Sequence, residues 1–143
     1  MYSLILDFFQ LSSILFIFFT GPLIARNDVL IFFQALSIVS ILWAAWEMKQ
    51  TRYYRIPDTG KQNELVMTGI YKYIRNPMYF AELLFSGILV LNFYNPIRLI
   101  VFIILLVDLL LKIRYEEELL KMFFKEKFAE YKKTSWRLLP FIF

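Results

Sequence analysis

The sequence contains no cysteine and no histidine. Without cysteine the chain cannot form a disulfide, offer a thiol nucleophile or build a zinc site of the Cys/His kind. Without histidine it lacks the side chain that most often carries protons near neutral pH. We therefore predict no metal site. The absence of cysteine is compatible with every compartment, so it leaves the location of the protein open.

Hydrophobic residues are abundant. They make up 59% of the 143 residues and include sixteen phenylalanines and five methionines. This share exceeds that of an ordinary soluble domain. The length suffices for one domain, so we expect residues 1–143 to form a single unit. The apolar side chains are concentrated in long runs, which predicts an integral membrane protein.

The apolar runs predict an all-α fold with four transmembrane helices. Their approximate bounds are 4–25, 29–48, 78–94 and 97–113. Very short connections join the first run to the second and the third to the fourth, so we expect two antiparallel hairpins. The first run carries Asp7 and Gln10 near its start, and we interpret Asp7 as interfacial. It has neither a cationic leader segment nor a small-residue cleavage site, and we expect it to be retained.

Two Asn-Pro pairs mark the starts of the later spans. Asn76-Pro77 precedes the third span, and Asn95-Pro96 opens the fourth. Asparagine is a preferred N-cap, and proline fits the first helical position, where its missing N–H costs no hydrogen bond. Both spans are therefore predicted to begin with a capped turn.

Polar residues gather in the loop 49–77 and in a segment from about 115 to 133. A polar loop of this length in a small membrane protein is usually functional. In the later segment Leu120, Phe124 and Phe128 recur at helical spacing, and lysines and glutamates fill the other face. This pattern predicts a C-terminal amphipathic helix that lies along the membrane interface and folds back over the protein.

The basic residues predict the topology. Of the sixteen lysines and arginines, only Arg26 and Arg98 lie outside the central loop and the region from Lys112 onward. With four spans, both polar regions face one side of the membrane, and the positive-inside rule makes that side cytoplasmic, together with both termini. The net charge of +4 is thus interpreted as a membrane signal, and no nucleic-acid partner is predicted.

The stretch 68–82 is the first candidate site. Gly69 permits a tight turn or the close approach of a ligand. Tyr71 and Tyr79 offer aromatic faces and hydroxyls, and Arg75 beside a helix start forms an electropositive spot suited to a carboxylate or a phosphate. The alternative interpretation is a membrane helix start that carries ordinary interfacial tyrosine and arginine.

Acidic residues supply further candidates. The run 116–118 follows the fourth span, where it could bind an amine or ribose hydroxyls, or could form a solvated face paired with nearby lysines. Within the spans, Glu82 is expected to face the same cavity as Arg75. Asp108 is expected to pair with Lys112, four residues later on the same helix.

Two separated motifs carry a resemblance. They read Thr68-Gly69-x-Tyr71-x-x-x-Arg75-Asn76-Pro77-x-Tyr79 and Glu116-Glu117-x-x-Leu120-x-x-x-Phe124, the latter followed by Phe128-x-x-Tyr131. In this order they resemble the isoprenylcysteine carboxyl methyltransferase family. The similarity extends from about Leu65 to Phe143. These enzymes and the related phospholipid methyltransferases are small integral membrane proteins that use S-adenosylmethionine.

The resemblance implies a cytoplasmic S-adenosylmethionine pocket between the central loop and the C-terminal helix. It assigns cofactor contacts to Thr68, Gly69, Tyr71, Asn76, Pro77, Tyr79, Glu116 and Glu117. It assigns catalytic positions to Arg75, Glu117 and Arg114. Arg75 would hold a carboxylate of the cofactor or the substrate, and Glu117 a ribose or an amino group.

This chain departs from the family pattern at three positions. Many members have histidine where Asn76 stands and glycine where Lys125 stands. An arginine is often found one turn before the acidic pair, where this chain has Lys112. Lysine cannot reproduce the planar, two-pronged geometry of arginine, so the substrate-positioning role is open between Lys112 and Arg114.

The implied acceptor is a lipophilic or lipidated molecule reached among membrane lipids. A carboxylate, such as an isoprenylcysteine-type group, is favoured over an amine because a carboxylate is already ionised near neutral pH and the sequence offers no obvious base. Two other functions stay open. One is an NADPH-dependent sterol or steroid reductase, which has a similar Arg-x-Pro-x-Tyr helix start, and the other is a non-catalytic membrane scaffold. The sequence does not indicate the oligomeric state.

Overall fold

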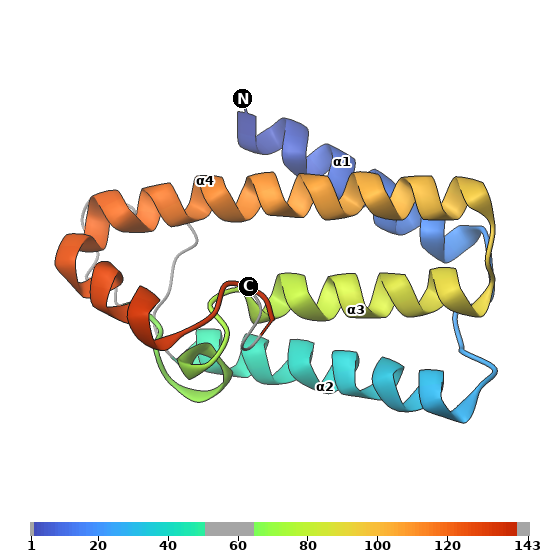
Figure 1. Cartoon of the computed structure of the whole chain (residues 1–143), viewed down its shortest axis with the longest axis horizontal. Helices are drawn as coiled ribbons and strands as arrows, with labels where there is room; N and C mark the ends of the chain where they lie inside the picture. The colour runs from blue at the N-terminus through green and yellow to red at the C-terminus, as the bar shows by residue number, and fades with distance from the viewer. Residues whose placement is uncertain (1, 51–64, 140–143) are drawn as a thin grey trace.

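The computed structural model describes residues 2–50 and 65–139, which form a helical bundle (Figure 1). In chain order the elements are α1 (Tyr2–Phe19), α2 (Asp28–Gln50), the short 3-10 helix η1 (Gly69–Lys72), α3 (Pro77–Asn92) and α4 (Pro96–Thr134). Over the described ranges the only β pairing is a single bridge between Ile74 and Trp136. The all-α prediction is confirmed. The predicted loop 49–77 lies partly outside the described residues, at 51–64.

The first helix is shorter than predicted. It ends at Phe19 rather than near residue 25, because the Gly-Pro pair at 21–22 cannot continue the helix. The chain that follows is fixed by the side-chain amide of Gln34, which accepts a hydrogen bond from Ala25 N at 3.1 Å and donates to Leu23 O at 2.6 Å. The connection to α2 is therefore an ordered crossing and not a minimal turn.

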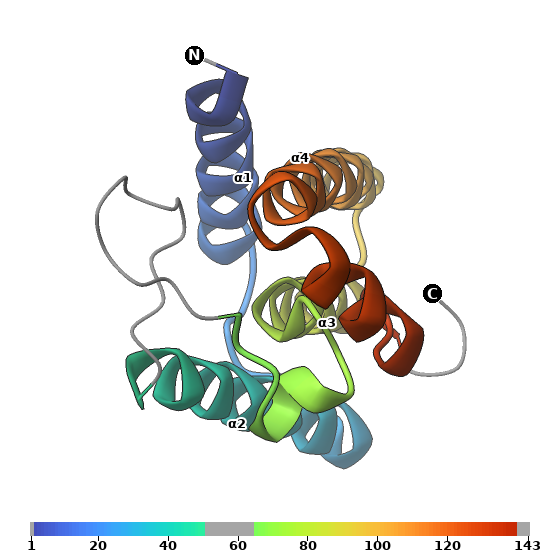
Figure 2. The same cartoon turned by 90° about the vertical axis from the view of Figure 1, so that its left-hand side faces the viewer.

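The four long helices pack in two pairs that differ from the sequence order. α1 packs mainly on α4, α2 packs mainly on α3, and α3 also contacts α4 (Figures 1 and 2). The central core contains Ile17, Tyr79, Leu89, Val90, Leu105, Leu109, Ile113 and Leu138. The predicted arrangement as two sequential hairpins is not confirmed, because α1 and α2 each have their principal partner elsewhere.

One described helix is long and apolar enough to cross a membrane, at Asp28–Lys49. Two shorter apolar helices cover Ser3–Phe19 and Pro77–Asn92. Large exposed apolar side chains, such as Phe8 and Phe32, lie on the outside of this bundle. These features agree with a membrane protein, and four complete crossings stay a prediction.

α4 continues well beyond the predicted fourth span and includes the predicted C-terminal amphipathic helix. It runs over 39 residues and is interrupted at Lys125, whose backbone has φ 41° and ψ −112°. After this kink the last turns fold back toward the start of α3 (Figure 1). Phe128 and Tyr131 are thereby buried against Leu65. The predicted return of the chain over the protein is present, and the kink at Lys125 makes it possible.

Lys125 occupies a left-handed backbone region that favours glycine. We expect Lys125→Gly to raise the free energy of unfolding by about 1 kcal/mol because it removes this strain. Lys121→Gly is the matched control: this exposed lysine lies in regular helix, where glycine should lower stability by about 1 kcal/mol. Thermal unfolding of both variants in detergent tests the expectation, and two shifts of the same sign would contradict it.

Candidate functional site

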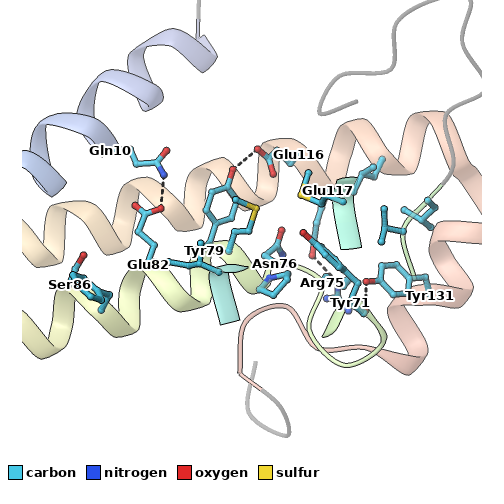
Figure 3. Close-up of a pocket in the computed structure, with 18 of the residues that line it drawn as sticks. Gln10, Tyr71, Arg75, Asn76, Tyr79, Glu82, Ser86, Glu116, Glu117 and Tyr131 are labelled. Atoms are coloured by element: carbon cyan, nitrogen blue, oxygen red, sulfur yellow. Dashed lines mark hydrogen bonds and ion pairs between the residues drawn. The ribbon is translucent and has the colours of Figure 1, made fainter. Parts of the chain in front are cut away.

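A pocket of about 350 Å³ lies between the two helix pairs (Figure 3). This volume lies within the range of small-molecule sites. The lining residues are Gln10, Ile14, Phe18, Ile41, Met48, Leu65, Val66, Tyr71, Arg75, Asn76, Pro77, Met78, Tyr79, Glu82, Phe85, Ser86, Glu116, Glu117, Leu120, Phe128 and Tyr131. Charged and amide groups gather near the start of α3. Apolar groups from α1 and α3 line the opposite end, so the pocket is amphipathic along its length.

Glu117 organises the polar end. Arg75 Nε donates to Glu117 Oε1 at 3.1 Å. Arg137 donates from Nε to Oε1 at 3.2 Å and from Nη2 to Oε2 at 2.8 Å. Lys132 Nζ lies 3.8 Å from Oε2. One buried carboxylate thus meets three cationic side chains that come from two separate parts of the chain.

Burial by itself raises the pKa of the Glu117 carboxyl. The hydrogen bonds and positive charges of Arg137 and Arg75 outweigh burial and hold the pKa below its ordinary value of 4.5. Glu117 is therefore ionised at neutral pH. Both of its oxygens accept from guanidinium groups, so its geometry orients the two arginines. The predicted contact with a ribose or an amino group stays a prediction.

The segment 135–139, which we name the C-terminal strap, crosses the start of α3. Arg75 N donates to Trp136 O at 2.8 Å, and Trp136 N donates to Tyr73 O at 2.9 Å. The Arg75 guanidinium also donates to the carbonyl of Ser135. The strap therefore fixes both the backbone and the side chain of Arg75.

The strap also changes the role of Asn76. The predicted side-chain cap at α3 is absent, because Asn76 Nδ2 donates to Arg137 O at 3.0 Å. The hydrogen bond to the carbonyl of Arg137 holds the Asn76 side chain, which therefore does not cap α3. By contrast, Asn95 caps α4 as predicted and accepts from Ile97 N at 2.8 Å.

Polar contacts between helices cross the middle of the pocket (Figure 3). Tyr79 on α3 donates to Glu116 Oε1 on α4 at 2.6 Å. Gln10 Nε2 on α1 donates to Glu82 Oε2 on α3 at 2.8 Å. The buried Lys112 donates to both Asp7 and Gln10. The predicted pair of Lys112 with Asp108 is thus replaced by contacts to α1, because α1 brings a carboxylate and an amide oxygen to the ammonium group.

The structure brings most of the predicted site residues together. Of the predicted positions, the pocket wall includes Tyr71, Arg75, Asn76, Pro77, Tyr79, Glu116 and Glu117. Thr68 and Gly69 lie outside it. Thr68 Oγ1 donates to Glu47 Oε2 at 2.9 Å, and Gly69, at φ 55°, lies so close to Glu47 that a Cβ atom would stand 2.0 Å from Oε1. These two residues dock η1 on α2.

The sequence left the substrate-positioning role open between Lys112 and Arg114, and the assignment of that role stays a prediction. Arg114 is exposed and does not line the pocket, and Lys112 is committed to Asp7 and Gln10. Arg137 instead supplies the second guanidinium at Glu117. Sequence reasoning missed Arg137, since no spacing rule connects it to the first motif. The fold alone brings the strap there.

Comparison with known proteins identifies a family and a relative. Residues 28–127 match the phospholipid methyltransferase family model. The Saccharomyces cerevisiae protein-S-isoprenylcysteine O-methyltransferase is 33% identical over 93 residues, which are 63% of this chain and 39% of the yeast protein. This chain therefore corresponds to well under two thirds of that relative's length. No solved structure matches.

The family match covers α2, α3, most of α4 and both motifs that line the polar end of the pocket. It leaves α1 outside. The family model and the yeast relative are both methyltransferases by name, which does not favour the reductase alternative. The chain belongs to the phospholipid methyltransferase family.

Proposed function

We propose that this protein transfers a methyl group from S-adenosylmethionine to a lipophilic acceptor in the membrane. The observation that carries the proposal is the amphipathic pocket, whose polar end is built by the motif residues of the family. Arg75 and Glu117 meet there, whereas Ile14 and Phe18 line the other end. Such a site can take a charged, water-soluble cofactor at one end and an apolar acceptor at the other.

The residues at the polar end fit the cofactor. Cationic side chains around Glu117 suit its carboxylate. Glu116 offers an acceptor for ribose hydroxyls or for the amino group, and Tyr79 orients this carboxylate through its hydrogen bond. Leu120 and Phe128 give an apolar surface for a flat base. The carboxylate, the base, and the ribose or the amino group of the cofactor thus have chemically matched side chains.

When bound, S-adenosylmethionine supplies a methyl group attached to a positively charged sulfur. Its displacement depends chiefly on positioning and on a suitable electrostatic environment. Arg75 holds an anionic group, and the strap keeps its guanidinium in place through Ser135. These residues position the reactants and stabilise their charges. A carboxylate acceptor is already ionised near neutral pH, so no proton has to be moved.

The acceptor in this proposal is a lipophilic carboxylate of the isoprenylcysteine type. The name of the yeast relative supports this choice, because it specifies O-methylation of an isoprenylcysteine protein. The exposed apolar surface of the bundle supports a site embedded in lipid. The acceptor then enters laterally from the bilayer, and the polar end opens to the cytoplasm under the four-span topology proposed from the basic residues.

Calorimetric titration with S-adenosylhomocysteine tests the proposal, with NADPH as the parallel ligand. We expect S-adenosylhomocysteine to bind and NADPH not to bind. Glu116→Gln should weaken the binding about tenfold because it replaces a charge-assisted hydrogen bond to the ligand by a neutral one. Glu118→Gln is the control, since Glu118 is exposed and does not line the pocket. Binding of NADPH alone, or of neither ligand to folded protein, would overturn the proposal.

A further inference from the structure

Ser86 is a buried serine at the apolar end of the pocket whose hydroxyl makes no hydrogen bond within residues 2–50 and 65–139. It lies on α3, is 1% exposed and lines the pocket. The buried serines of α2 are satisfied by contrast: Ser37 donates to the carbonyl of Gln34 at 2.7 Å, and Ser40 donates to the carbonyl of Leu36 at 2.8 Å. A buried hydroxyl without a partner is costly, so each such group calls for an explanation. A ligand that brings a polar group to Ser86 provides one.

Glu82 lies one helical turn before Ser86, and both side chains project from α3 toward the same side of the pocket (Figure 3). Glu82 Oε2 accepts a hydrogen bond from Gln10 Nε2 at 2.8 Å. The orientation of the Gln10 amide is fixed by chemistry, because the ammonium group of Lys112 can only donate and therefore faces Oε1. The NH₂ group of Gln10 must then face Glu82. Glu82 is thus held as an acceptor beside the Ser86 hydroxyl.

The walls around this pair are apolar. Ile14 and Phe18 of α1 and Phe85 of α3 line the same end of the pocket. The family match begins at residue 28, so the side chains from α1 lie outside the matched region. The Ser86 hydroxyl and the Glu82 carboxylate are therefore polar groups among apolar walls, where a hydrogen bond is worth more than in water.

We propose that Glu82, Ser86 and Gln10 form a subsite that recognises a neutral hydroxyl carried by the lipophilic body of the acceptor. A hydroxyl can donate to Glu82 and accept from Ser86 at once. Side chains four residues apart on a helix are separated by about 5–6 Å at their Cβ atoms, a gap that one oxygen can bridge. The hydroxyl is a recognition element, whereas the methyl-accepting group belongs at the Arg75 end. The identification of this ligand as the acceptor rests on the proposed function.

The test compares two probes of equal chain length, 1-dodecanol and dodecane. Full-length protein in lipid nanodiscs is equilibrated with each radiolabelled probe, and empty nanodiscs give the background. For each variant we take the ratio of the affinity for 1-dodecanol to the affinity for dodecane. Because the lipid is the same for every variant, the partition of the probes into lipid cancels when these ratios are compared. We expect Ser86→Ala to lower the preference for the alcohol about fivefold, the effect of losing one neutral hydrogen bond. Ser86→Cys keeps the volume and weakens the bond, so it should lower the preference in the same direction.

Ser40→Ala is the matched control, since it removes the same hydroxyl from α2 at a position outside the pocket. Its preference for the alcohol should equal that of the wild type. An unchanged preference in Ser86→Ala, or equal affinities of the two probes in the wild type, would overturn the subsite. Titration with S-adenosylhomocysteine separates the two proposals: unchanged cofactor-analogue binding in Ser86→Ala is expected. A wild-type protein that prefers the alcohol without binding the analogue would retain the subsite and refute the methyltransferase.

Discussion

Arg75→Ala is expected to reduce the affinity for S-adenosylhomocysteine, and methyl transfer with it, by about 100-fold or more. The Arg75 side chain is 9% exposed and donates to Glu117, whose side chain is 7% exposed. Because Arg75 is proposed to hold the carboxylate of the cofactor, alanine would remove a buried charged contact with the ligand, a loss of about 3 kcal/mol that corresponds to this factor. The same change frees the carbonyl of Ser135, so the strap should loosen and the thermal midpoint should fall.

Two further variants make the Arg75 result interpretable. Arg75→Lys keeps the positive charge without the planar fork, so we expect an intermediate loss of about tenfold. Arg114→Ala removes an exposed arginine that does not line the pocket and should leave analogue binding at the wild-type level. Calorimetric titration and thermal unfolding are measured on the same preparations. If Arg75→Ala bound the analogue normally, Arg75 would have no place in the site.

Arg98→Ala is expected to lower the free energy of unfolding by about 3 kcal/mol. Arg98 is 2% exposed and is the largest fully buried side chain of the described residues. Its guanidinium donates to Leu89 O at 2.9 Å, near the end of α3, and to Thr20 Oγ1 at 3.2 Å, just after α1. Alanine would leave a large cavity and an unsatisfied carbonyl together. The helix ends at this side of the bundle would then separate more easily.

Thermal unfolding measures the Arg98 effect, for which we expect a fall in midpoint of about 10 °C. Arg26→Ala is the control, because Arg26 is exposed and lies in the connection that follows α1. Arg98→Met fills most of the volume without the charge and should retain part of the lost stability. A midpoint of Arg98→Ala equal to that of Arg26→Ala would show that the buried guanidinium does not join the helices.

Local sequence signals predicted the helical elements well. The apolar runs gave each of the four long helices, since a stretch of such side chains is stable as a helix in an apolar environment. Asn95-Pro96 marked the start of α4 correctly. The Gly-Pro pair at 21–22 explains why α1 ends at Phe19. The kink at Lys125 had no helix-breaking residue to reveal it, because lysine is an ordinary helix former.

The candidate site was predicted in part, for a similar reason. Arg75, Tyr79 and Glu117 stand in two short motifs whose residue types already indicate binding of a charged ligand, and all three line the pocket. Arg137 and Gln10 were missed as site residues, since neither stands in a motif. Their contacts span 20 residues to Glu117 and 72 residues to Glu82. Such distant pairs are decided by how helices pack.

The sequence by itself determined three features: an apolar composition typical of membrane proteins, the existence of the helices, and the identity of the motif residues. These depend on the polarity of short segments and on the chemistry of individual side chains. Only the tertiary structure decided which helices are partners, how the strap fixes Arg75, and which cations surround Glu117. Such outcomes depend on complementary shape and on hydrogen bonds between segments far apart in the chain, and no local pattern encodes them.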